Sequence, residues 1–355
     1  MHILRFKSHR IVSSSALRTT VAIVAASAIV LCSCSRTGKT PTGGAHFTDE
    51  VRLACTPVKD QGRSSLCWVY AMLATIETEH IMAGDSVNLS VDCIARRILA
   101  ERARLHFLSR GKTGIDMRGM ASAVPRIMAE YGIYPYDSYY ARDVNYNSLA
   151  RRIAAVAATS PDMSRADKAV ARTLDDRIGH LPPNVYMLGA QYTPVEFAHS
   201  VCARNEYVAL TSFTHHPYGT RFALEVPDNR DGDMFLNVTP DELMRCIESS
   251  LRAGHPVCWE GDTSEPGFSF SRGTAVLRQE RACTAAERQR EFECLRTTDD
   301  HCMELIGIAR DGQGKLYFIA KNSWGTRNPY GGMMYLSENY VRLKTVAVVV
   351  KNLRF

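Results

Sequence analysis

A cysteine stands where a polar loop turns into a predicted helix, at the end of the segment Gln61–Cys67 (QGRSSLC). The loop contains glycine and serine, whereas apolar side chains with helical spacing follow the cysteine. The free N–H groups and the dipole at a helix N-terminus favour the thiolate, which is the nucleophilic form of cysteine. Cys67 is therefore a candidate nucleophile.

A histidine and an asparagine near the C-terminal end supply partners of the type that a nucleophilic cysteine needs. His301 begins a β-prone run, and Asn322 follows 21 residues later at the end of the next such run. On adjacent strands, Asn322 can accept a hydrogen bond from one imidazole nitrogen while the other nitrogen faces Cys67. This constellation predicts thiol-based nucleophilic catalysis.

The elements that must position these residues are helices in the first part of the chain. Trp68, Ala71, Met72, Thr75 and Ile76 share one face of the helix that begins at Cys67. Capping boxes with proline at the first helical position predict later helix starts. The expected elements are a helix ending before Gly84, one starting near Ser90, one through Met117–Tyr131, and helices after Thr193 and Thr239.

The last third of the chain has a different pattern, with short β-prone runs separated by glycine-containing turns. Helices followed by strands predict an α+β fold, with two lobes and a cleft between them. The expected strands are Met303–Arg310, Lys315–Lys321, Met333–Ser337 and Thr345–Lys351.

Three motifs in the same order resemble the papain-like (C1) cysteine peptidases: PVKDQGRSSLCW at 57–68, His301, and KNSWG at 321–325. The resemblance implies a two-lobe papain-like fold, with a helical lobe, an antiparallel β lobe and a cleft between. It also implies a peptidase domain over 51–355. Within it, the helical lobe covers about 60–140, a helical insertion about 141–205, and the β-rich lobe about 206–355.

Two departures from papain point to the bleomycin hydrolase/aminopeptidase C branch. Cys67 and His301 are 234 residues apart, whereas the papain spacing is about 130–150 residues. The loop before Cys67 lacks the extra cysteine of papain and is similar to the QGRSG-x-CW loop of the branch. Residues 114–140 and 208–229 also look like segments of that branch, whereas 141–192 have no clear counterpart.

The resemblance assigns a role to each matching residue. Cys67 would be the nucleophile, His301 the general acid and base, and Asn322 the neutral group that orients the imidazole. The Gln61 side chain would form the oxyanion hole with the Cys67 N–H. Trp324 would shield the pair formed by Asn322 and His301 from water.

The implied activity is thiol-dependent hydrolysis of peptide bonds in peptide or protein substrates, in the manner of an aminopeptidase. The branch restricts its cleft with a C-terminal arm, and here Phe355 closes a short tail that just reaches the cleft mouth or stops short of it. An open-cleft endopeptidase is therefore an alternative. A non-catalytic binding lipoprotein and a thiol acyltransferase are further alternatives on the same fold. The sequence does not decide the oligomeric state.

The N-terminus has the pattern of a targeting segment. Residues 21–31 (VAIVAASAIVL) are apolar or small and follow a basic lead-in, which is typical of a signal peptide and too short to span a bilayer. Cys34 follows the small Ser33 and resembles the lipidated cysteine of a bacterial lipobox. We expect a lipoprotein signal peptide at 1–33 and a tether at 34–50. The mature protein would be exported to the bacterial cell envelope and lipid-anchored to a membrane.

Composition and charge exclude one class of partner. The 355 residues are 45% hydrophobic and 23% charged, which is typical of a globular protein. The formal charge of +6 includes four basic residues and no acidic residue in the first 33, so the remainder carries only +2. A nearly neutral protein lacks the basic surface that nucleic-acid binding requires.

The remaining cysteines and histidines do not predict a cofactor or a metal. Eleven cysteines are present, but no CxxC or HExxH motif occurs, and the sequence selects no disulfide pairing. We interpret most of these cysteines as buried apolar residues and His215–His216 as surface or packing residues. Strand alternation predicts that Cys302 points away from the His301 face. Arg96–Arg97 and Glu287–Glu293 are expected on solvated helix faces.

Overall fold

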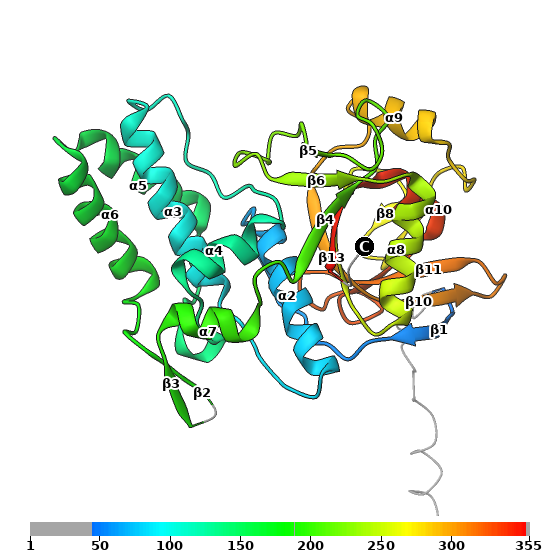
Figure 1. Cartoon of the computed structure of the whole chain (residues 1–355), viewed down its shortest axis with the longest axis horizontal. Helices are drawn as coiled ribbons and strands as arrows, with labels where there is room; N and C mark the ends of the chain where they lie inside the picture. The colour runs from blue at the N-terminus through cyan, green and yellow to red at the C-terminus, as the bar shows by residue number, and fades with distance from the viewer. Residues whose placement is uncertain (1–44, 188, 353–355) are drawn as a thin grey trace, which may run out of the picture. The chain divides into compact units, whose positions relative to one another are not determined.

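The computed structural model describes residues 45–187 and 189–352. Most helices lie in the first half of this part and most strands in the second half (Figure 1), so the α+β class expected from the sequence is confirmed. The expected signal peptide, Cys34, most of the tether and Phe355 lie outside the described residues. No helix in 45–187 or 189–352 is both long and apolar enough to cross a membrane.

Seven helical segments make up the first half. Helices α5 and α6 pack on α3, and α7 packs on α4, so these helices cover one another rather than the sheet. A two-stranded hairpin lies between α6 and α7. The segments are α2 (Cys67–Met82), α3 (Val91–Leu108), α4 (Ala123–Tyr131), the 3-10 helix η1 (Tyr136–Ser138), α5 (Tyr146–Thr159), α6 (Met163–Ile178), β2 (Val185–Met187), β3 (Ala190–Tyr192) and α7 (Pro194–Val201).

The second half forms one mixed, mainly antiparallel sheet. Its strand order is β5-β6-β4-β13-β7-β10-β11-β12-β9-β8, and β1 pairs with β10. Helices α8, α9 and α10 connect the strands. The bounds are β1 (Phe47–Arg52), β4 (Tyr207–Thr211), β5 (Arg221–Ala223), β6 (Met234–Asn237), α8 (Pro240–Arg252), β7 (Val257–Gly261), β8 (Phe268–Ser269), β9 (Thr274–Ala275), α9 (Ala285–Glu293), β10 (His301–Asp311), β11 (Leu316–Lys321), β12 (Met333–Ser337), α10 (Glu338–Lys344) and β13 (Thr345–Lys351).

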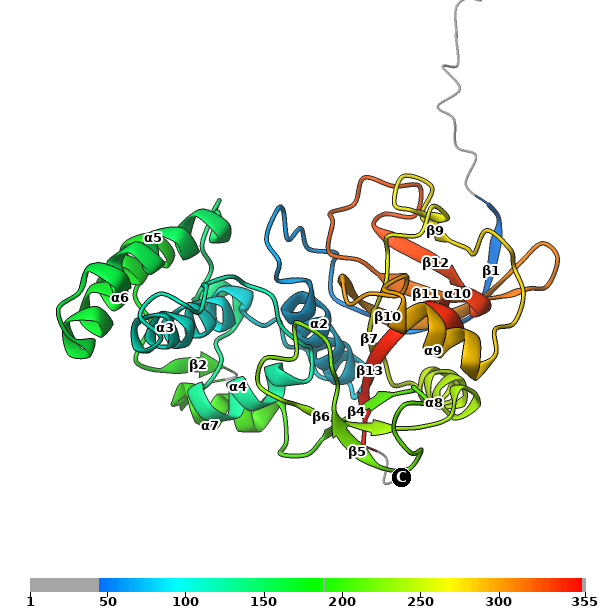
Figure 2. The same cartoon turned by 90° about the horizontal axis from the view of Figure 1, so that it is seen from above.

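Helix α2 lies between the other helices and the sheet, as Figures 1 and 2 both show. It packs against β10 and β7, and eleven of its residues between Trp68 and Glu79 are buried. One apolar cluster joins α2 to the neighbouring helices and to one face of the sheet, and a second fills the opposite face under α8 and α10. A helix that is buried on nearly all sides has little freedom to shift, which suits a helix that carries a reactive residue.

The predicted helix starts are correct at the capped ends and wrong at one uncapped end. The Ser90 side chain caps α3, and Thr193 and Thr239 form the expected capping boxes. The helix predicted through 117–131 begins only at Ala123. The residues before it form a loop in which Gly119 lies against the Trp68 ring, so closely that a Cβ there would be 2.7 Å from a ring carbon.

Two arginines that were expected on solvated helix faces are buried instead. Arg96 donates to Asp175 and to the carbonyl of Gly179, and thereby joins α3 to the end of α6. Arg288 is 1% exposed and donates to the carbonyls of Ser212 and Thr345. Both predictions were wrong because carbonyl and carboxylate partners from distant segments satisfy the guanidinium groups, and a charge pattern on one helix does not reveal them.

Candidate active site

Cys67 is the first residue of α2, as the sequence predicts. No side chain caps this end of the helix, so the thiol lies at the positive end of the α2 dipole without a competing cap. The Trp68 indole N–H donates to the carbonyl of Met117 at 2.9 Å. This bond, with the close contact of Gly119, fixes the loop that borders Cys67 on the helical side.

His301 and Asn322 are brought together at the ends of β10 and β11. The Nε2 of His301 lies 2.8 Å from the Oδ1 of Asn322, and both residues are buried. This bond places the proton on Nε2 and leaves Nδ1 for Cys67. The Trp324 ring lies 4.5 Å from the His301 ring, measured between centroids, and covers the pair. The structure therefore brings His301, Asn322 and Trp324 together, and Cys67 lines the same cleft as His301 and Trp324.

Gln61 lies beside this group in the loop that precedes α2. Its backbone N–H donates to the Ser323 carbonyl at 2.8 Å, and its Oε1 accepts from the Ser323 hydroxyl at 2.6 Å. Its Nε2 donates to the carbonyl of Ser64 at 2.8 Å, which leaves one N–H of the amide for another acceptor. Ser323 thus fixes the Gln61 side chain, a role that the sequence analysis did not assign.

Cys302 interacts with Cys67, contrary to the interpretation that it points away from the site. Strand alternation does turn Cys302 to the opposite side of β10 from His301, but α2 packs on that side. Interaction with the Cys302 thiol, and then with His301, holds the pKa of Cys67 well below its usual value although burial opposes this. Cys67 therefore lies between a histidine and a second thiol.

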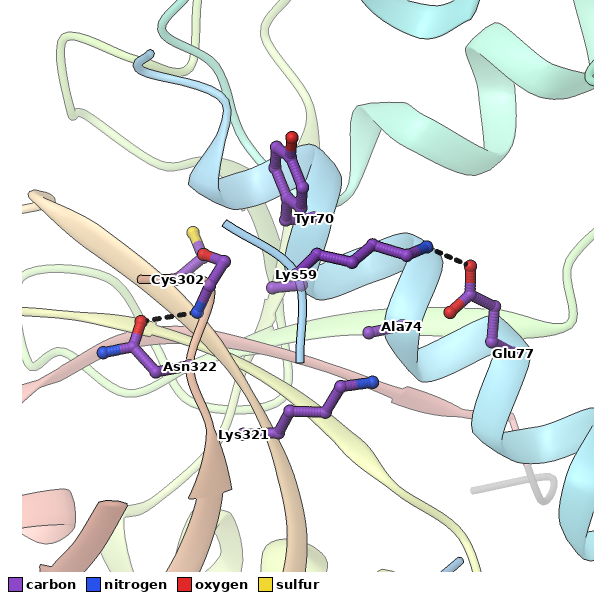
Figure 3. Close-up of a pocket in the computed structure, with 9 residues that line it drawn as sticks. Lys59, Tyr70, Ala74, Glu77, Cys302, Lys321 and Asn322 are labelled. Atoms are coloured by element: carbon purple, nitrogen blue, oxygen red, sulfur yellow. Dashed lines mark hydrogen bonds and ion pairs between the residues drawn. The ribbon is translucent and has the colours of Figure 1, made fainter. Parts of the chain in front are cut away.

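A small cavity lies behind the nucleophile, between α2 and the ends of β10 and β11 (Figure 3). Its volume is about 20 Å³, which is enough for one water molecule. Around it, Glu77 accepts from Lys59 and from the Thr56 hydroxyl, and Lys321 donates to Thr56 and pairs with Glu304. We call these five residues the ion-pair network: Thr56, Lys59, Glu77, Glu304 and Lys321.

The cleft in front of Cys67 has a volume of about 200 Å³ and contains several acidic residues. Glu260 on β7 and Asp299 before β10 are both buried in its wall, and we call them the acid pair. Burial raises the pKa of Asp299 to about 7 and that of Glu260 well above its usual value. Asp228 also lines the cleft, but it accepts two hydrogen bonds from Arg118.

The sequence analysis did not identify Ser323, Cys302 or the acid pair as site residues. A signal was nevertheless present for two of them. Glu260 is the only charged residue in the apolar run Val257–Gly261, and Asp299 stands two residues before the candidate histidine. A carboxylate in a predicted buried strand is uncommon unless it has a partner or a function.

His215 and His216 meet a carboxylate that the sequence analysis did not connect to them. Their Nε2 atoms lie 3.1 and 2.6 Å from the two oxygens of Glu225. The three ligand-type atoms lie within 4.8 Å of one another. His216 stacks on Phe222 and His215 on Phe292, so the expected packing role of the two histidines is present.

All nine cysteines in the described part of the chain are free thiols. Four are buried, namely Cys93, Cys202, Cys258 and Cys302, and burial raises the pKa of each. Only Cys67 has a lowered pKa among those with a resolved shift. The thiolate character that nucleophilic attack requires is thus concentrated at Cys67.

The elements around this cleft define the papain-like fold of cysteine peptidases. A solved structure with similar architecture is PepW from Lactobacillus rhamnosis, with a TM-score of 0.63 and 16% identity over 86% of this chain and 82% of that one. Xylellain, a cysteine protease from Xylella fastidiosa, has a TM-score of 0.46 and 15% identity over 87% of this chain and 88% of its own.

Sequence comparison gives a finer match. Residues 183–354 match the model of the Peptidase C1-like family, and this segment includes His301 and Asn322. A curated relative, Aminopeptidase G from Lactobacillus delbrueckii subsp. lactis, is 25% identical over 196 residues. That alignment covers 50% of this chain and 41% of the relative, so the chain spans less than half of the relative's length. The fold is thus similar to that of papain-like cysteine peptidases, and residues 183–354 are similar to the Peptidase C1-like family.

Proposed function

We propose that the chain hydrolyses peptide bonds with Cys67 as the nucleophile. One observation carries the proposal: the thiol at the start of α2 lines the same cleft as His301, and His301 is held by Asn322 at 2.8 Å. This is the sequence of contacts that an activated thiol requires, with a base beside the nucleophile and a third group that orients the base.

In the first half of the reaction the Cys67 thiolate attacks the carbonyl carbon of the scissile bond. The oxyanion that forms accepts hydrogen bonds from the Cys67 N–H and the Gln61 Nε2, because the Gln61 amide has one N–H beyond the bond to Ser64. Protonated His301 then donates its Nδ1 proton to the departing amine. The C–N bond breaks, and a thioester to Cys67 remains.

In the second half, water attacks the thioester. His301 accepts a proton from this water, and the C–S bond breaks to release the acid and restore the thiolate. The Asn322 bond keeps the imidazole plane fixed through both halves, since Nε2 remains bonded while Nδ1 exchanges protons. The Trp324 ring lies 4.5 Å from the His301 ring, measured between centroids, and covers it.

For the mode of cleavage we propose an aminopeptidase of the bleomycin hydrolase-like branch, with an open-cleft endopeptidase as the alternative. The aminopeptidase relative supports the first mode. The course of β13 is relevant to the endopeptidase alternative. Lys351, near the end of β13, pairs with Glu79. Glu79 is twelve residues along α2 from Cys67, or about 18 Å. The strand β13 therefore leads away from the cleft as far as Lys351.

We also propose that the protein is an exported lipoprotein that acts on peptides or proteins at the bacterial cell envelope. The support is the apolar segment 21–31 and the small residue before Cys34. Labelled palmitate should enter the full-length protein in its bacterial host and should not enter the Cys34→Ala variant. Incorporation that survives this change but is lost in Cys32→Ala would move the modified residue to Cys32.

The peptidase proposal is tested by labelling and by turnover. An epoxide or iodoacetamide probe at mildly acidic pH should modify Cys67 before any other cysteine, with the exposed Cys294 as the internal comparison. A mixed peptide library should be cleaved, and the cleavage sites should be lost when the probe has reacted. Preferential labelling of Cys294, or cleavage that survives modification of Cys67, would contradict the proposal.

The mode is tested with matched fluorogenic substrates. A free aminoacyl substrate should be hydrolysed faster than its N-acetylated counterpart if the enzyme is an aminopeptidase. Faster hydrolysis of the acetylated substrate would favour the endopeptidase alternative.

A further inference from the structure

The acid pair, Glu260 and Asp299, lies next to the nucleophile and does not serve to link elements of the fold. Glu260 is directly opposite Cys302 in the pairing of β7 with β10, so the two side chains share the face of the sheet on which α2 packs. Asp299 lies beside Glu260, two residues before His301. Both carboxyl groups line the cleft that contains Cys67. Their exposed fractions are only 1% and 7%.

The acid pair lacks the donors that buried carboxylates normally have. Neither oxygen of Glu260 nor the Oδ2 of Asp299 accepts a hydrogen bond from a described nitrogen or hydroxyl donor. The polar neighbours of Glu260 are the Cys302 thiol and Asp299 itself. Burying carboxylates in this way costs free energy, and the cost falls when a cation or a proton compensates the charge.

Three other buried carboxylates in the described chain have a donor or a cation, and one of them, Glu304, accepts no hydrogen bond but pairs with Lys321 at 3.3 Å. Glu77 accepts from Lys59, from Thr56 and from the Leu89 N–H. Asp92 accepts from the Ala141 N–H and the Tyr146 hydroxyl. The unmatched charge is therefore not a general feature of this fold but is located at the cleft.

The arginine in the cleft wall is already paired with a carboxylate outside the acid pair. Arg118 lines the cleft, but its guanidinium donates to both oxygens of Asp228, at 2.7 and 3.0 Å. It reaches Asp299 only at the backbone carbonyl, at 3.3 Å. Asp300 also lines the cleft and accepts from Thr263. The cleft wall thus contains four carboxyl groups and one arginine, and that arginine is already paired with Asp228.

We propose that Glu260 and Asp299 form a subsite that binds a cationic group of the substrate, an ammonium or a guanidinium. The leaving amine must meet His301, which Trp324 covers, whereas the acid pair lies beyond Cys302. The cation therefore belongs to the acyl portion of the substrate. Two sources have this chemistry: the substrate's own α-amino group, and a lysine or arginine side chain near the scissile bond. The inference rests on the proposed peptidase function and names its substrate class.

A comparison of substrates on the wild-type, full-length protein tests the subsite without any variant. The substrates are dipeptides linked to aminomethylcoumarin. The N-terminal residue of each dipeptide is arginine, citrulline or norleucine, and its amino group is either free or acetylated. Citrulline keeps the shape of arginine and removes the charge. A site with unmatched buried carboxylates should prefer a cationic substrate over its neutral counterpart by roughly tenfold or more in kcat/KM.

The two sources give different results. If arginine exceeds citrulline with either N-terminus, the subsite binds the side chain. If only the free N-terminus increases the rate and arginine equals citrulline, the subsite binds the α-amino group. Equal rates for all members of the set would overturn the inference. If no member is hydrolysed and Cys67 also resists labelling, the proposed function fails instead.

The variants Glu260→Gln and Asp299→Asn then assign the preference to residues. Each should lower kcat/KM for the preferred cationic substrates roughly tenfold and leave the norleucine substrate with a blocked N-terminus within about twofold. Asp231→Asn is the matched control, because Asp231 is an exposed acid near Asp228 that pairs with Arg126. Equal losses on cationic and neutral substrates, or a selectivity unchanged in both variants, would contradict the assignment.

Discussion

Buried charged groups lie at both ends of the space between α2 and the sheet, but only the groups at one end are paired with groups of opposite charge. Behind the nucleophile, the ion-pair network alternates acids with lysines, and Glu77 has three donors. In front of it, the acid pair has no cation of its own. Both groups belong to the same helix–sheet interface, and Glu77 and Glu304 of the network are buried as deeply as the acid pair. The difference is therefore one of partners and not of depth.

The comparison separates residues that hold the fold from residues that act on a substrate. The acids and lysines of the ion-pair network compensate one another, so the network requires no ligand. Removal of one member leaves an uncompensated charge inside the protein. An unmatched carboxylate is stabilised when a cation or a proton binds to it. Changes in the network should therefore lower stability, whereas changes at the cleft should lower rates.

The largest effect is expected at the nucleophile. Cys67→Ala removes the attacking atom and should lower turnover by roughly 10⁴-fold or more. Because the Cys67 side chain is only partly buried and lies at the end of a helix, the midpoint of thermal unfolding should change little. Turnover of the mixed peptide library and thermal unfolding, measured on the same preparation, check both statements. Retained activity would place the nucleophile elsewhere.

The next effect should appear in stability and not in chemistry. Glu77→Ala removes the acceptor for Lys59, Thr56 and the Leu89 N–H. The expected loss in the free energy of unfolding is about 3 kcal/mol. Chemical denaturation measures it, with Glu248→Ala as the control, since Glu248 forms an exposed pair with Arg252. An equal loss in both variants would show that the buried network contributes no more to stability than an exposed ion pair.

A smaller change in rate is expected at the orienting residue. Asn322→Ala removes the acceptor for His301 Nε2, so the imidazole can rotate, and kcat should fall roughly 100-fold while a residual rate remains. Steady-state kinetics with one fluorogenic peptide measure this, and Asn339→Ala on the surface-facing side of α10 serves as the control. A loss as complete as that of Cys67→Ala in a folded protein would mean that Asn322 does more than orient the ring.

The smallest expected effect distinguishes the second thiol from the histidine. Cys302 lowers the pKa of Cys67, so Cys302→Ala should raise that pKa and reduce the thiolate fraction at acidic pH. Alkylation of Cys67 should slow by less than about tenfold near pH 6 and should converge with the wild-type rate at alkaline pH. The buried Cys93→Ala is the control. An unchanged pH profile would remove Cys302 from the activation of Cys67.

The sequence was sufficient for features that depend on neighbouring residues. Threonine caps with a glutamate three residues later marked the starts of α7 and α8, because both hydrogen bonds form within one turn. Cys67, His301 and Asn322 were found from their motifs. Their meeting required only that a helix start and two adjacent strand ends converge.

Features that depend on distant segments were not predictable in this way. Alternation placed Cys302 on the correct face of β10, but only the packing of α2 brings that face to the nucleophile. Arg288 is surrounded by carbonyls from β13 and from the end of β4, far from α9 in the sequence. The charge pattern of one helix contains no information about such partners, so both interpretations failed for the same reason.

The pairing of β1 with β10 determines where the preceding chain joins the domain. Phe47 lies opposite Asp311, at the far end of β10 from His301. Ten residues of extended strand separate these ends, a distance of roughly 30 Å. If the protein is anchored through its N-terminus, any pull on the anchor acts as a shear along β1 and β10 and enters the sheet at the end remote from the catalytic histidine. Such a pull would therefore reach the sheet about 30 Å from His301.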